Sequence, residues 1–221
     1  GEKCEVMINH KNGSMLSSGD VIGVVTGSVR EILSRERVML NLIQRLCGIA
    51  TLSYEYTEIA SPSNVKILDT RKTTPGLRLF EKYAVAIGGA FNHRLNLSHG
   101  ILIKDNHIIA AGSVTNAIES ARKKGANLPL EIEVDNIDQI YEALTTGVNG
   151  FLLDNMKPET VTSAVSIIRA SNNGEDVFIE ASGGISLENI QSYLDTGINA
   201  ISIGALTHQA RSKNIRLDFI S

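Results

Sequence analysis

A cluster of cations and hydroxyls, Arg71-Lys72-Thr73-Thr74-Pro75-Gly76-Leu77-Arg78, follows a short apolar segment at residues 65–69. The Pro-Gly pair predicts a tight turn, and the apolar segment predicts a buried strand before it. In α/β proteins ligands bind where strands end. Folding alone does not require so many cations in one turn, so the turn indicates a site for an anion. A solvated basic loop is the alternative.

Other predicted strands also end in polar or charged residues. Any one of these side chains could be paired with a neighbour for structural reasons alone. Charge placed repeatedly at the same end of parallel strands is instead typical of a shared active site. The residues are Lys104, Glu131, Glu133, Asp154, Glu180, Ser182 and His208.

The chemistry of these residues divides the site into parts. Arginines such as Arg71 and Arg94 suit carboxylates or phosphate oxygens, and a dicarboxylate would need at least two of them. The small residues after two late strands, at 182–184 and 204–205, could close their backbone N–H groups on a phosphate. Glu133 and Asp154 could meet Mg²⁺ carried by a phosphorylated substrate, or a sugar with developing positive charge. A structural acid pair is the alternative.

The elements that must position these residues alternate along the chain. Helical segments at 114–124, 137–146, from 158 and at 187–196 separate short apolar runs, which predicts parallel strands joined by helical crossovers. We therefore predict an α/β barrel of parallel strands. The absence of Gly-x-Gly-x-x-Gly after a first strand weakens the dinucleotide-binding alternative. The apolar runs lie at 65–69, 101–104, 130–134, 151–154, 177–180 and 200–203.

The first third of the chain has a different pattern. Residues 1–30 alternate β-branched segments with Asn-Gly and Gly-Asp turns, which predicts a small antiparallel sheet. Residues 31–60 predict a long helix or a pair of helices with a broad apolar face. We divide the chain into an N-terminal part with a connecting helix (1–60), a barrel (61–205) and a C-terminal segment (206–221).

Composition limits the classes of protein to which the chain can belong. It has 221 residues, 43% of them apolar, and a formal net charge of −3. The net charge argues against a nucleic-acid-coating protein, and no apolar run is long enough for a membrane span. The two cysteines make no metal spacing or disulfide framework, which fits a reducing compartment. We therefore expect a cytoplasmic protein that binds neither nucleic acid nor membrane.

Several stretches, in order along nearly the whole chain, resemble the nicotinate-nucleotide pyrophosphorylases, the decarboxylating quinolinate phosphoribosyltransferases of NAD biosynthesis. The most specific are Arg-Lys-Thr-Thr-Pro-Gly, Asn-His-Arg and Lys-Asp-Asn-His. The resemblance implies an α/β barrel, with residues 1–60 belonging to a partial N-terminal sandwich domain. The matching stretches are 36–41 with 48–51, 71–78, 92–94, 102–107, 131–135, 153–156, 180–185 and 201–208.

The resemblance also implies a Mg²⁺-dependent reaction of quinolinate with phosphoribosyl pyrophosphate, giving nicotinate mononucleotide, pyrophosphate and CO₂. It implies a homodimer with shared active sites. Its catalytic residues would be Lys72, Lys104, Glu133 and Asp154, of which Glu133 and Asp154 would face ribose and metal, directly or indirectly. Quinolinate would be bound by Arg71, Lys72, His93, Arg94 and Lys104, with Arg37 from the neighbouring subunit. Phosphates would be held by Ser182, Gly183, Gly184, Gly204 and His208, beside Glu133 and Asp154.

Family members usually carry further residues ahead of the position that corresponds to Gly1. The chain is thus expected to be N-terminally truncated relative to the family. This leaves an alternative function, a catalytically impaired or regulatory barrel that binds quinolinate or phosphoribosyl ligands. A transferase for a different pyridine or purine base is a weaker alternative, because the many cations near Arg71 do not suit a neutral base.

Overall fold

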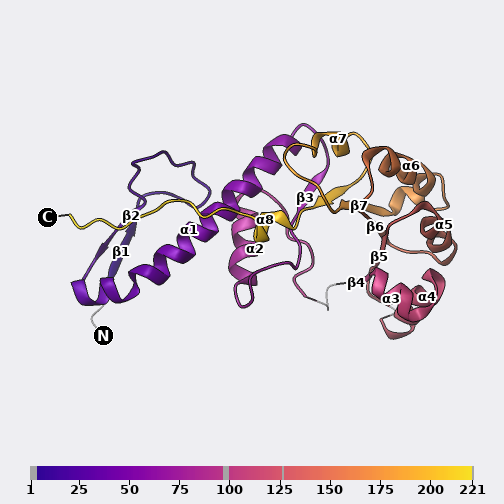
Figure 1. Ribbon diagram of the computed structural model, residues 1–221, viewed down its shortest axis with the longest axis horizontal. Coiled ribbons are helices and arrows are strands. Elements are labelled where there is room, and N and C mark those ends of the chain that lie inside the picture. The colour runs from indigo at the N-terminus through magenta and orange to yellow at the C-terminus, as the bar shows by residue number, and fades with distance from the viewer. Residues whose placement is uncertain (1–3, 97–99, 126, 221) are drawn as a thin grey trace.

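An elongated molecule, in which an N-terminal arm projects from an α/β body, is seen in the computed structural model (Figure 1). The structure describes residues 4–96, 100–125 and 127–220. The arm contains the antiparallel strands β1 (Glu5–Ile8) and β2 (Gly23–Thr26) and the first half of helix α1 (Val29–Ala60). The predicted small antiparallel sheet is confirmed, and residues 31–60 form one helix rather than two.

The body is built on a six-stranded parallel sheet with strand order β3-β8-β7-β6-β5-β4. Every apolar run predicted as a strand forms one, which confirms the α/β class and the parallel sheet. Among the described residues the edge strands β3 and β4 do not pair with each other, so the barrel is open on that side. The strands are β3 (Lys66–Leu68), β4 (Ile101–Ile103), β5 (Leu130–Val134), β6 (Gly150–Asp154), β7 (Phe178–Ser182) and β8 (Ala200–Ser202).

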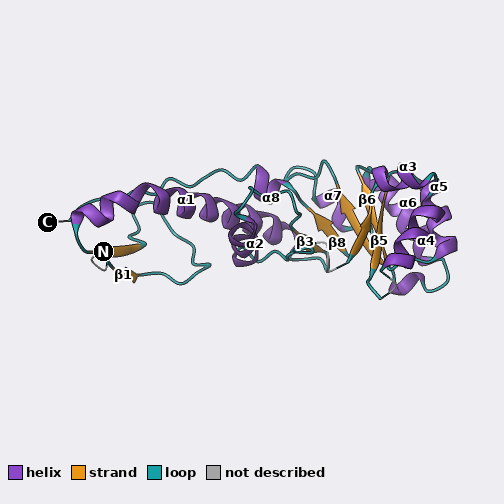
Figure 2. Ribbon diagram, turned by 90° about the horizontal axis from the view of Figure 1, so that it is seen from below, coloured by secondary structure: helices purple, strands orange, loops and turns teal. Residues whose placement is uncertain are grey.

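Helices of the crossovers cover the outer face of the sheet (Figure 2). Helix α4 (Val114–Lys124) begins where the Ser113 side chain accepts a hydrogen bond from Asn116 N, and α5 (Ile137–Thr146) begins in the same way at Asn136. Both helices have the predicted bounds. The others in the body are α2 (Arg78–Ile87), α3 (Asp105–Ala111), α6 (Pro158–Arg169), the short 3₁₀-helix η1 (Gly174–Asp176), α7 (Gln191–Leu194) and α8 (Ala205–His208).

Strand β5 shows how the sheet positions polar groups. Leu130, Ile132 and Val134 are fully buried, whereas Glu131 and Glu133 alternate with them and are partly accessible. Because successive side chains of a strand point to opposite faces, the apolar set faces the helices and both glutamates face the interior of the barrel. The alternation thus places two carboxylates on one wall of the site.

Helix α1 and the C-terminal segment lie side by side (Figure 1). Lys213 N donates to Gln44 O at 3.0 Å, and Gln44 Nε2 donates to Ile215 O. A Cβ at Gly48 would lie 2.2 Å from Arg211 O, so only glycine allows this close approach. The second half of α1 also contacts β3, α2, α7 and α8, and joins the arm firmly to the body.

Three parts of the body differ from the sequence-based expectation. The predicted helix at 187–196 is wrong in extent, because only residues 191–194 are α-helical. Before it the chain makes tighter turns, in which Tyr193 N donates to Ile190 O and Ser192 N to Asn189 O. Helices α2 and α3 lie where the sequence analysis predicts no helix, directly after the basic turn and the end of β4. None of the helices in the described residues is both long and apolar enough to cross a bilayer.

We expect Ile132→Ala in β5 to lower the free energy of unfolding by about 2–5 kcal/mol, because it leaves a cavity at a fully buried position. Denaturant unfolding monitored by circular dichroism measures this change. Ile109→Ala is the matched control, since Ile109 is 76% exposed, and it should change the free energy by less than about 0.5 kcal/mol. Similar losses in both variants would contradict the position of β5 in the core.

Candidate active site

The C-terminal ends of β5, β6 and β7 bring several of the predicted site residues to one face. Glu133 lies opposite Leu152, which lies opposite Glu180, and two residues further on Asp154 lies opposite Ser182. Residues opposite each other on neighbouring strands point to the same side of a sheet. Glu133, Asp154, Ser182 and Glu180 therefore share the inner face of the barrel.

Lys104 joins this face from the end of β4. Its ammonium forms an ion pair with the Glu133 carboxylate, so two of the predicted catalytic residues are in contact. Asp154 accepts a hydrogen bond from Asn155 Nδ2 at 2.7 Å. Asn155 itself has a positive φ of 53° while its N–H donates to Ser182 O, which joins the ends of β6 and β7.

The cations of the basic turn have different tasks. Arg78 begins helix α2 and closes the turn, because its Nε donates to Thr73 Oγ1 and its guanidinium also donates to Arg71 O. The Arg71 guanidinium has no hydrogen-bond or ion-pair partner within the described part of the chain. Arg71, rather than Arg78, is therefore free to bind an anion.

A buried carboxylate on α2 shapes this turn. Glu81 is fully buried and accepts from Thr74 N at 3.0 Å and from Thr74 Oγ1 at 2.7 Å. Arg45 of α1 donates to the same carboxylate at 2.9 Å and also to Thr207 O and Ala210 O. These contacts connect α1, the basic turn and α8, and they hold Arg71 and Lys72 in place.

Arg94 lies close enough to Arg71 for their charges to repel. Burial lowers the pKa of the Arg94 guanidinium, and the charge of Arg71 lowers it further. Negative charges of Glu131, Glu180 and Glu133 act in the opposite direction. Like charges held near each other in a protein create a favourable place for an anion. The pair therefore fits the predicted role in binding carboxylates.

Two glycine turns follow the neighbouring strands β7 and β8. Gly183 and Gly184 have φ angles of 88° and 63°, and a Cβ at Gly183 would collide with the Asn155 side chain. Gly204 lies against Lys72 and His208, since a Cβ there would be 3.2 Å from Lys72 Cδ and 3.0 Å from His208 Nε2. Thr207 Oγ1 donates to Lys72 O at 2.7 Å. The predicted phosphate turn at 204–208 is thus adjacent to the basic turn.

A buried ion pair holds the backbone of His93. Asp69 and Lys82 are almost fully buried, and the Lys82 ammonium lies 2.5 Å from the Asp69 carboxylate. His93 N donates to Asp69 Oδ1 at 2.8 Å, and Lys82 Nζ donates to His93 O at 3.1 Å. Burial raises the pKa of Asp69, and the contacts with Lys82 and the His93 amide oppose this shift without cancelling it.

The His93 ring lies between a backbone amide and two glutamates. Arg94 N donates to His93 Nδ1 at 2.8 Å, whereas His93 Nε2 lies 3.2 Å from Glu180 Oε2 and 3.7 Å from Glu131 Oε2. The contact with Glu180 has the distance of an ion pair but not the alignment of a hydrogen bond, because both Glu180 oxygens remain without a donor. His93 therefore contacts the chain through both ring nitrogens.

The pKa of His93 reflects opposing effects. Burial lowers it, but the contact with Glu180 and the charges of Glu180 and Glu131 outweigh burial, so that the pKa is raised. A proton on Nδ1 would break the bond from Arg94 N. We adopt the neutral ring with its proton on Nε2, because an aligned hydrogen bond fixes the acceptor on Nδ1.

Glu131 has the most perturbed carboxyl group of the site. Burial and the charge of Glu180 raise its pKa to about 7, although His93 and Arg94 oppose the shift. Within the described residues, His93, Glu131 and Glu180 form the group whose ligand atoms are close enough to share a metal ion. The predicted metal ligands Glu133 and Asp154 do not belong to this group, and their role stays a prediction.

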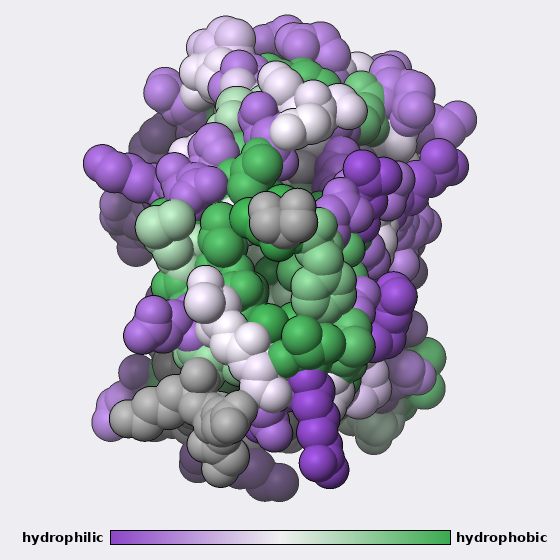
Figure 3. All heavy atoms as spheres, turned by 90° about the vertical axis from the view of Figure 1, so that its left-hand side faces the viewer, coloured by the Kyte–Doolittle hydropathy of each residue, from purple (hydrophilic) through white to green (hydrophobic). Residues whose placement is uncertain are grey.

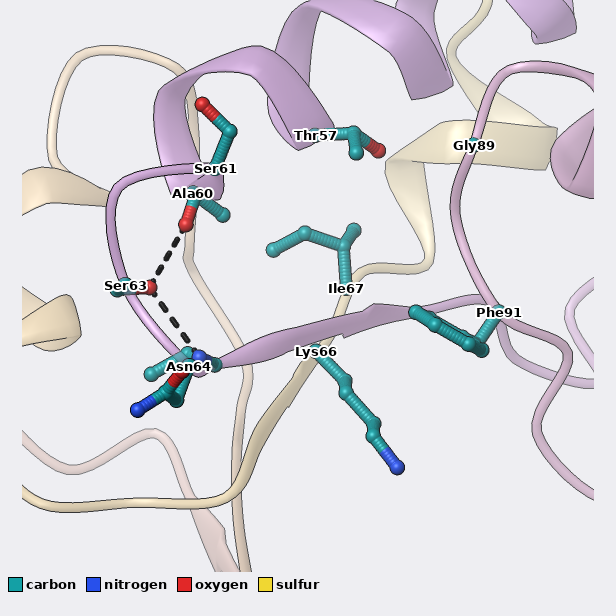
Figure 4. A pocket seen from close by; sticks show the side chains of 10 residues that line it. Thr57, Ala60, Ser61, Ser63, Asn64, Lys66, Ile67, Gly89 and Phe91 are labelled. Carbon is teal, nitrogen blue, oxygen red and sulfur yellow. Dashed lines mark hydrogen bonds between the residues drawn. The ribbon is translucent and has the colours of Figure 1, made fainter.

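Arg37 lies apart from the other predicted residues. It is on the arm, its side chain is 72% exposed, and its nearest acid is the neighbouring Glu36 at 4.0 Å. A surface hollow lies at the start of β3 and is lined by Thr57, Lys66 and Phe91 (Figure 4). The site is identified by the charged and polar side chains at the carboxyl ends of the strands, and not by the shape of this hollow.

Reasoning from the sequence missed the residues that support the site. Charged residues interrupt apolar patterns at Glu81-Lys82 and at Asp69. A charge within an apolar pattern indicates a buried ion pair, and this is the signal for the supporting residues. Glu131 and Glu180 were recognised at strand ends but received no role. The residues to which the sequence gives no individual role are Arg45, Asp69, Glu81, Lys82, Glu131 and Glu180.

The chain matches two family models, end to end. Residues 2–47 match the N-terminal domain of quinolinate phosphoribosyl transferase, and residues 49–218 match its C-terminal domain. The residues at which the models meet lie within helix α1. Both models together cover almost all of the sequence.

Similar proteins carry related names. A probable nicotinate-nucleotide pyrophosphorylase [carboxylating] of Bacillus subtilis is 44% identical, and the match covers 98% of this chain and 74% of that protein. The Mycobacterium leprae enzyme of the same name is 42% identical over 96% and 74% of the two chains. A crystal structure of nicotinate-nucleotide pyrophosphorylase from Ehrlichia chaffeensis is 39% identical, with a TM-score of 0.91 and coverage of 97% and 77%.

We expect Asp69→Asn to lower the free energy of unfolding by about 3–5 kcal/mol, because it leaves the Lys82 ammonium buried without an anion. Denaturant unfolding measures the loss. The double variant Asp69→Asn/Lys82→Met should lose less than the sum of the two single variants. Additive losses would contradict a coupled pair.

The raised pKa of Glu131 predicts a dependence of stability on pH. Between its ordinary value of 4.5 and about 7, the folded state binds more protons than the unfolded state, so this carboxyl group makes stability fall as pH rises. Glu131→Gln should therefore flatten the decline of the unfolding free energy over this range. Urea titrations at several pH values measure it, and an unchanged slope would contradict the shift.

Proposed function

Because the chain belongs to the quinolinate phosphoribosyltransferase family, we propose that its barrel mouth joins quinolinate to phosphoribosyl pyrophosphate. The products are nicotinate mononucleotide, pyrophosphate and CO₂. This reaction of NAD biosynthesis releases CO₂. The name nicotinate-nucleotide pyrophosphorylase [carboxylating] describes the same reaction in the reverse direction. The comparisons give no support to the alternative of an impaired or regulatory barrel.

The observation that carries the proposal is the guanidinium of Arg71, unpartnered among the described residues, whose charge acts on the partly buried Arg94. The two guanidiniums repel each other, and Arg71 has no partner within the described part of the chain. A dicarboxylate such as quinolinate supplies one carboxylate to each fork and removes the repulsion. Lys72 follows Arg71 in the same turn. A neutral base would leave these cations uncompensated, which disfavours a transferase for another base.

The phosphoribosyl side of the site follows from the glycine turns and the inner carboxylates. Ser182 ends β7 and is followed by Gly183 and Gly184, while Gly204 and His208 follow β8, and the N–H groups and side chains of these turns can hold phosphate oxygens. Glu133 and Asp154 lie on β5 and β6, the strands between β7 and the β4 end that carries Lys104. They are placed to hold the ribose and to stabilise positive charge at its anomeric carbon.

The bond changes define what the residues must do. The pyridine nitrogen attacks the anomeric carbon as the bond to pyrophosphate breaks and the leaving group keeps the electron pair. The ring nitrogen then becomes cationic, so the bond to the adjacent carboxylate can break with its electron pair held on the ring as an ylide. That carbon takes up a proton. Orientation and charge neutralisation by Arg71, Arg94 and Lys104 serve both steps, and Lys104 or Lys72 can stand near the leaving CO₂.

Magnesium is part of the proposal. Glu133 and Asp154 offer the carboxylate oxygens that Mg²⁺ prefers, directly or through water, and they share one face of the sheet. When bound, the ion would neutralise charge on the pyrophosphate group. The contact of Glu133 with Lys104 leaves Asp154 as the less compensated of the two carboxylates.

We propose a homodimer in which Arg37 reaches the site of the partner. Arg37 lies on the projecting arm, away from the other site residues of its own chain. The arm also exposes large apolar side chains, and apolar side chains gather on the side of the molecule seen in Figure 3. The exposed apolar residues of the arm include Val6, Met7, Ile8, Met15 and Leu33.

A cytoplasmic location and the division of the chain into parts also belong to the proposal. Cys4 and Cys47 are free thiols, which fits a reducing compartment. Residues 1–60 would form the N-terminal part and the connecting helix, residues 61–205 the catalytic barrel, and residues 206–221 a C-terminal segment along α1.

We expect Arg94→Ala and Lys104→Ala each to lower kcat/KM for quinolinate by about 100-fold or more, because each removes a charge-assisted contact in the transition state. Release of nicotinate mononucleotide, measured by chromatography with both substrates present, tests this. Lys124→Ala, at an exposed position on α4, is the matched control and should keep full turnover. Normal turnover in the first two variants would contradict the site assignment.

A further inference from the structure

Glu180 is a buried carboxylate for which the proposed reaction has no direct use. Its side chain is fully buried in β7, and neither of its oxygens accepts a hydrogen bond from the described residues. Burying a carboxylate without donors costs free energy, and an apolar residue would fill the same place more favourably. Its presence in the interior of the barrel therefore indicates a task other than stability.

The contacts of Glu180 lead to Arg94 through one side chain. Glu180 Oε2 lies 3.2 Å from His93 Nε2, and on the other side of the ring His93 Nδ1 accepts from Arg94 N at 2.8 Å. A neutral imidazole has one donor nitrogen and one acceptor nitrogen. The bond from Arg94 N makes Nδ1 the acceptor, so the Nε2 proton faces Glu180, whose charge at 3.2 Å favours this tautomer and this orientation of the ring.

The backbone on which the ring is mounted is held separately. Asp69 accepts from His93 N, and Lys82 donates to His93 O, so the peptide groups on both sides of His93 cannot rotate freely. The remaining freedom is the rotation of the His93 side chain, and that rotation is what Glu180 and Glu131 restrict. Because the ring accepts from Arg94 N, a fixed ring completes the restraint on the peptide group that joins His93 to Arg94.

We propose that Glu180 is a positioning residue for quinolinate, which acts through the His93 ring to set the backbone of Arg94. His93 is then also a positioning residue, because both of its ring nitrogens are occupied within the chain. This inference rests on the proposed function, since Arg94 is assigned there to a carboxylate of quinolinate. The positioning role explains why a carboxylate is buried at Glu180, which is not among the residues proposed to bind substrate.

The same three side chains could be considered as ligands of a metal ion. A metal on His93 Nε2 would need that nitrogen as an acceptor, while the aligned bond from Arg94 N already makes Nδ1 the acceptor. The nearby Arg94 guanidinium also supplies positive charge to the glutamates. The contacts therefore favour a proton on Nε2 over a metal ion.

Glu180→Gln tests the proposal, because it keeps the shape of the side chain and removes its charge. We expect KM for quinolinate to rise about tenfold, with kcat and KM for phosphoribosyl pyrophosphate changed less than about twofold. The melting temperature should stay the same or rise, because a buried carboxylate without donors is lost. Glu142→Gln on α5 is the matched control and should change none of these values.

A second variant, His93→Phe, keeps the ring volume but removes both nitrogens. It should raise KM for quinolinate as much as Glu180→Gln, and the double variant should show no further rise, since both act on one path. Additive effects, an unchanged KM for quinolinate in Glu180→Gln, or a rise confined to phosphoribosyl pyrophosphate would overturn the proposal.

Isothermal titration of the wild type with Zn²⁺ or Mn²⁺ in the absence of substrates provides a further readout. Stoichiometric binding that is lost in Glu180→Gln would overturn the positioning role in favour of a metal site. Failure of the wild type to convert quinolinate would instead contradict the proposed function, so the two failures are distinguishable.

Discussion

The structure of the site depends on two adjacent charges of helix α2 that cannot be buried alone. Glu81 binds Arg45 and both polar groups of Thr74, while Lys82 binds Asp69 and the backbone of His93. A buried charge without a partner is so costly that each pair must form when the chain folds. Through Glu81 the helix holds the basic turn, and through Lys82 it holds the segment that carries Arg94.

This constraint separates the cations that bind ligands from those that build the site. Arg45, Arg78 and Lys82 contact chain groups, whereas Arg71 keeps a guanidinium without a partner among the described residues. The acids divide in the same way, since Glu81 and Asp69 support the backbone while Glu133 and Asp154 face the interior of the barrel. A preorganised site of this kind needs little rearrangement when a charged substrate binds.

The fold was largely predictable because hydrophobic periodicity reports burial directly. The alternation in Leu130-Glu131-Ile132-Glu133-Val134 predicts β5 and the face of its glutamates, and Ser113 and Asn136 mark the starts of α4 and α5 through their capping side chains. Helix α7 is shorter than predicted, because local turns at Asn189 and Ile190 replace the expected α-helical hydrogen bonds. Helices α2 and α3 were missed since their charged first turns resemble binding loops. His107 illustrates this, as its ring accepts a hydrogen bond from Lys104 N at the start of α3.

The sequence by itself determined the class of fold, the family and the types of side chain at the strand ends, because these depend on local pattern and on motifs such as Arg71–Lys72 and Asn92–Arg94. Only the tertiary structure decided which charges meet. The pairing of Asp69 with Lys82, and the ring of His93 between Glu180 and Arg94 N, join residues from different elements. Electrostatic energy depends on distance and burial rather than on spacing along the chain, and for that reason the partners of buried charges could not be predicted from the sequence.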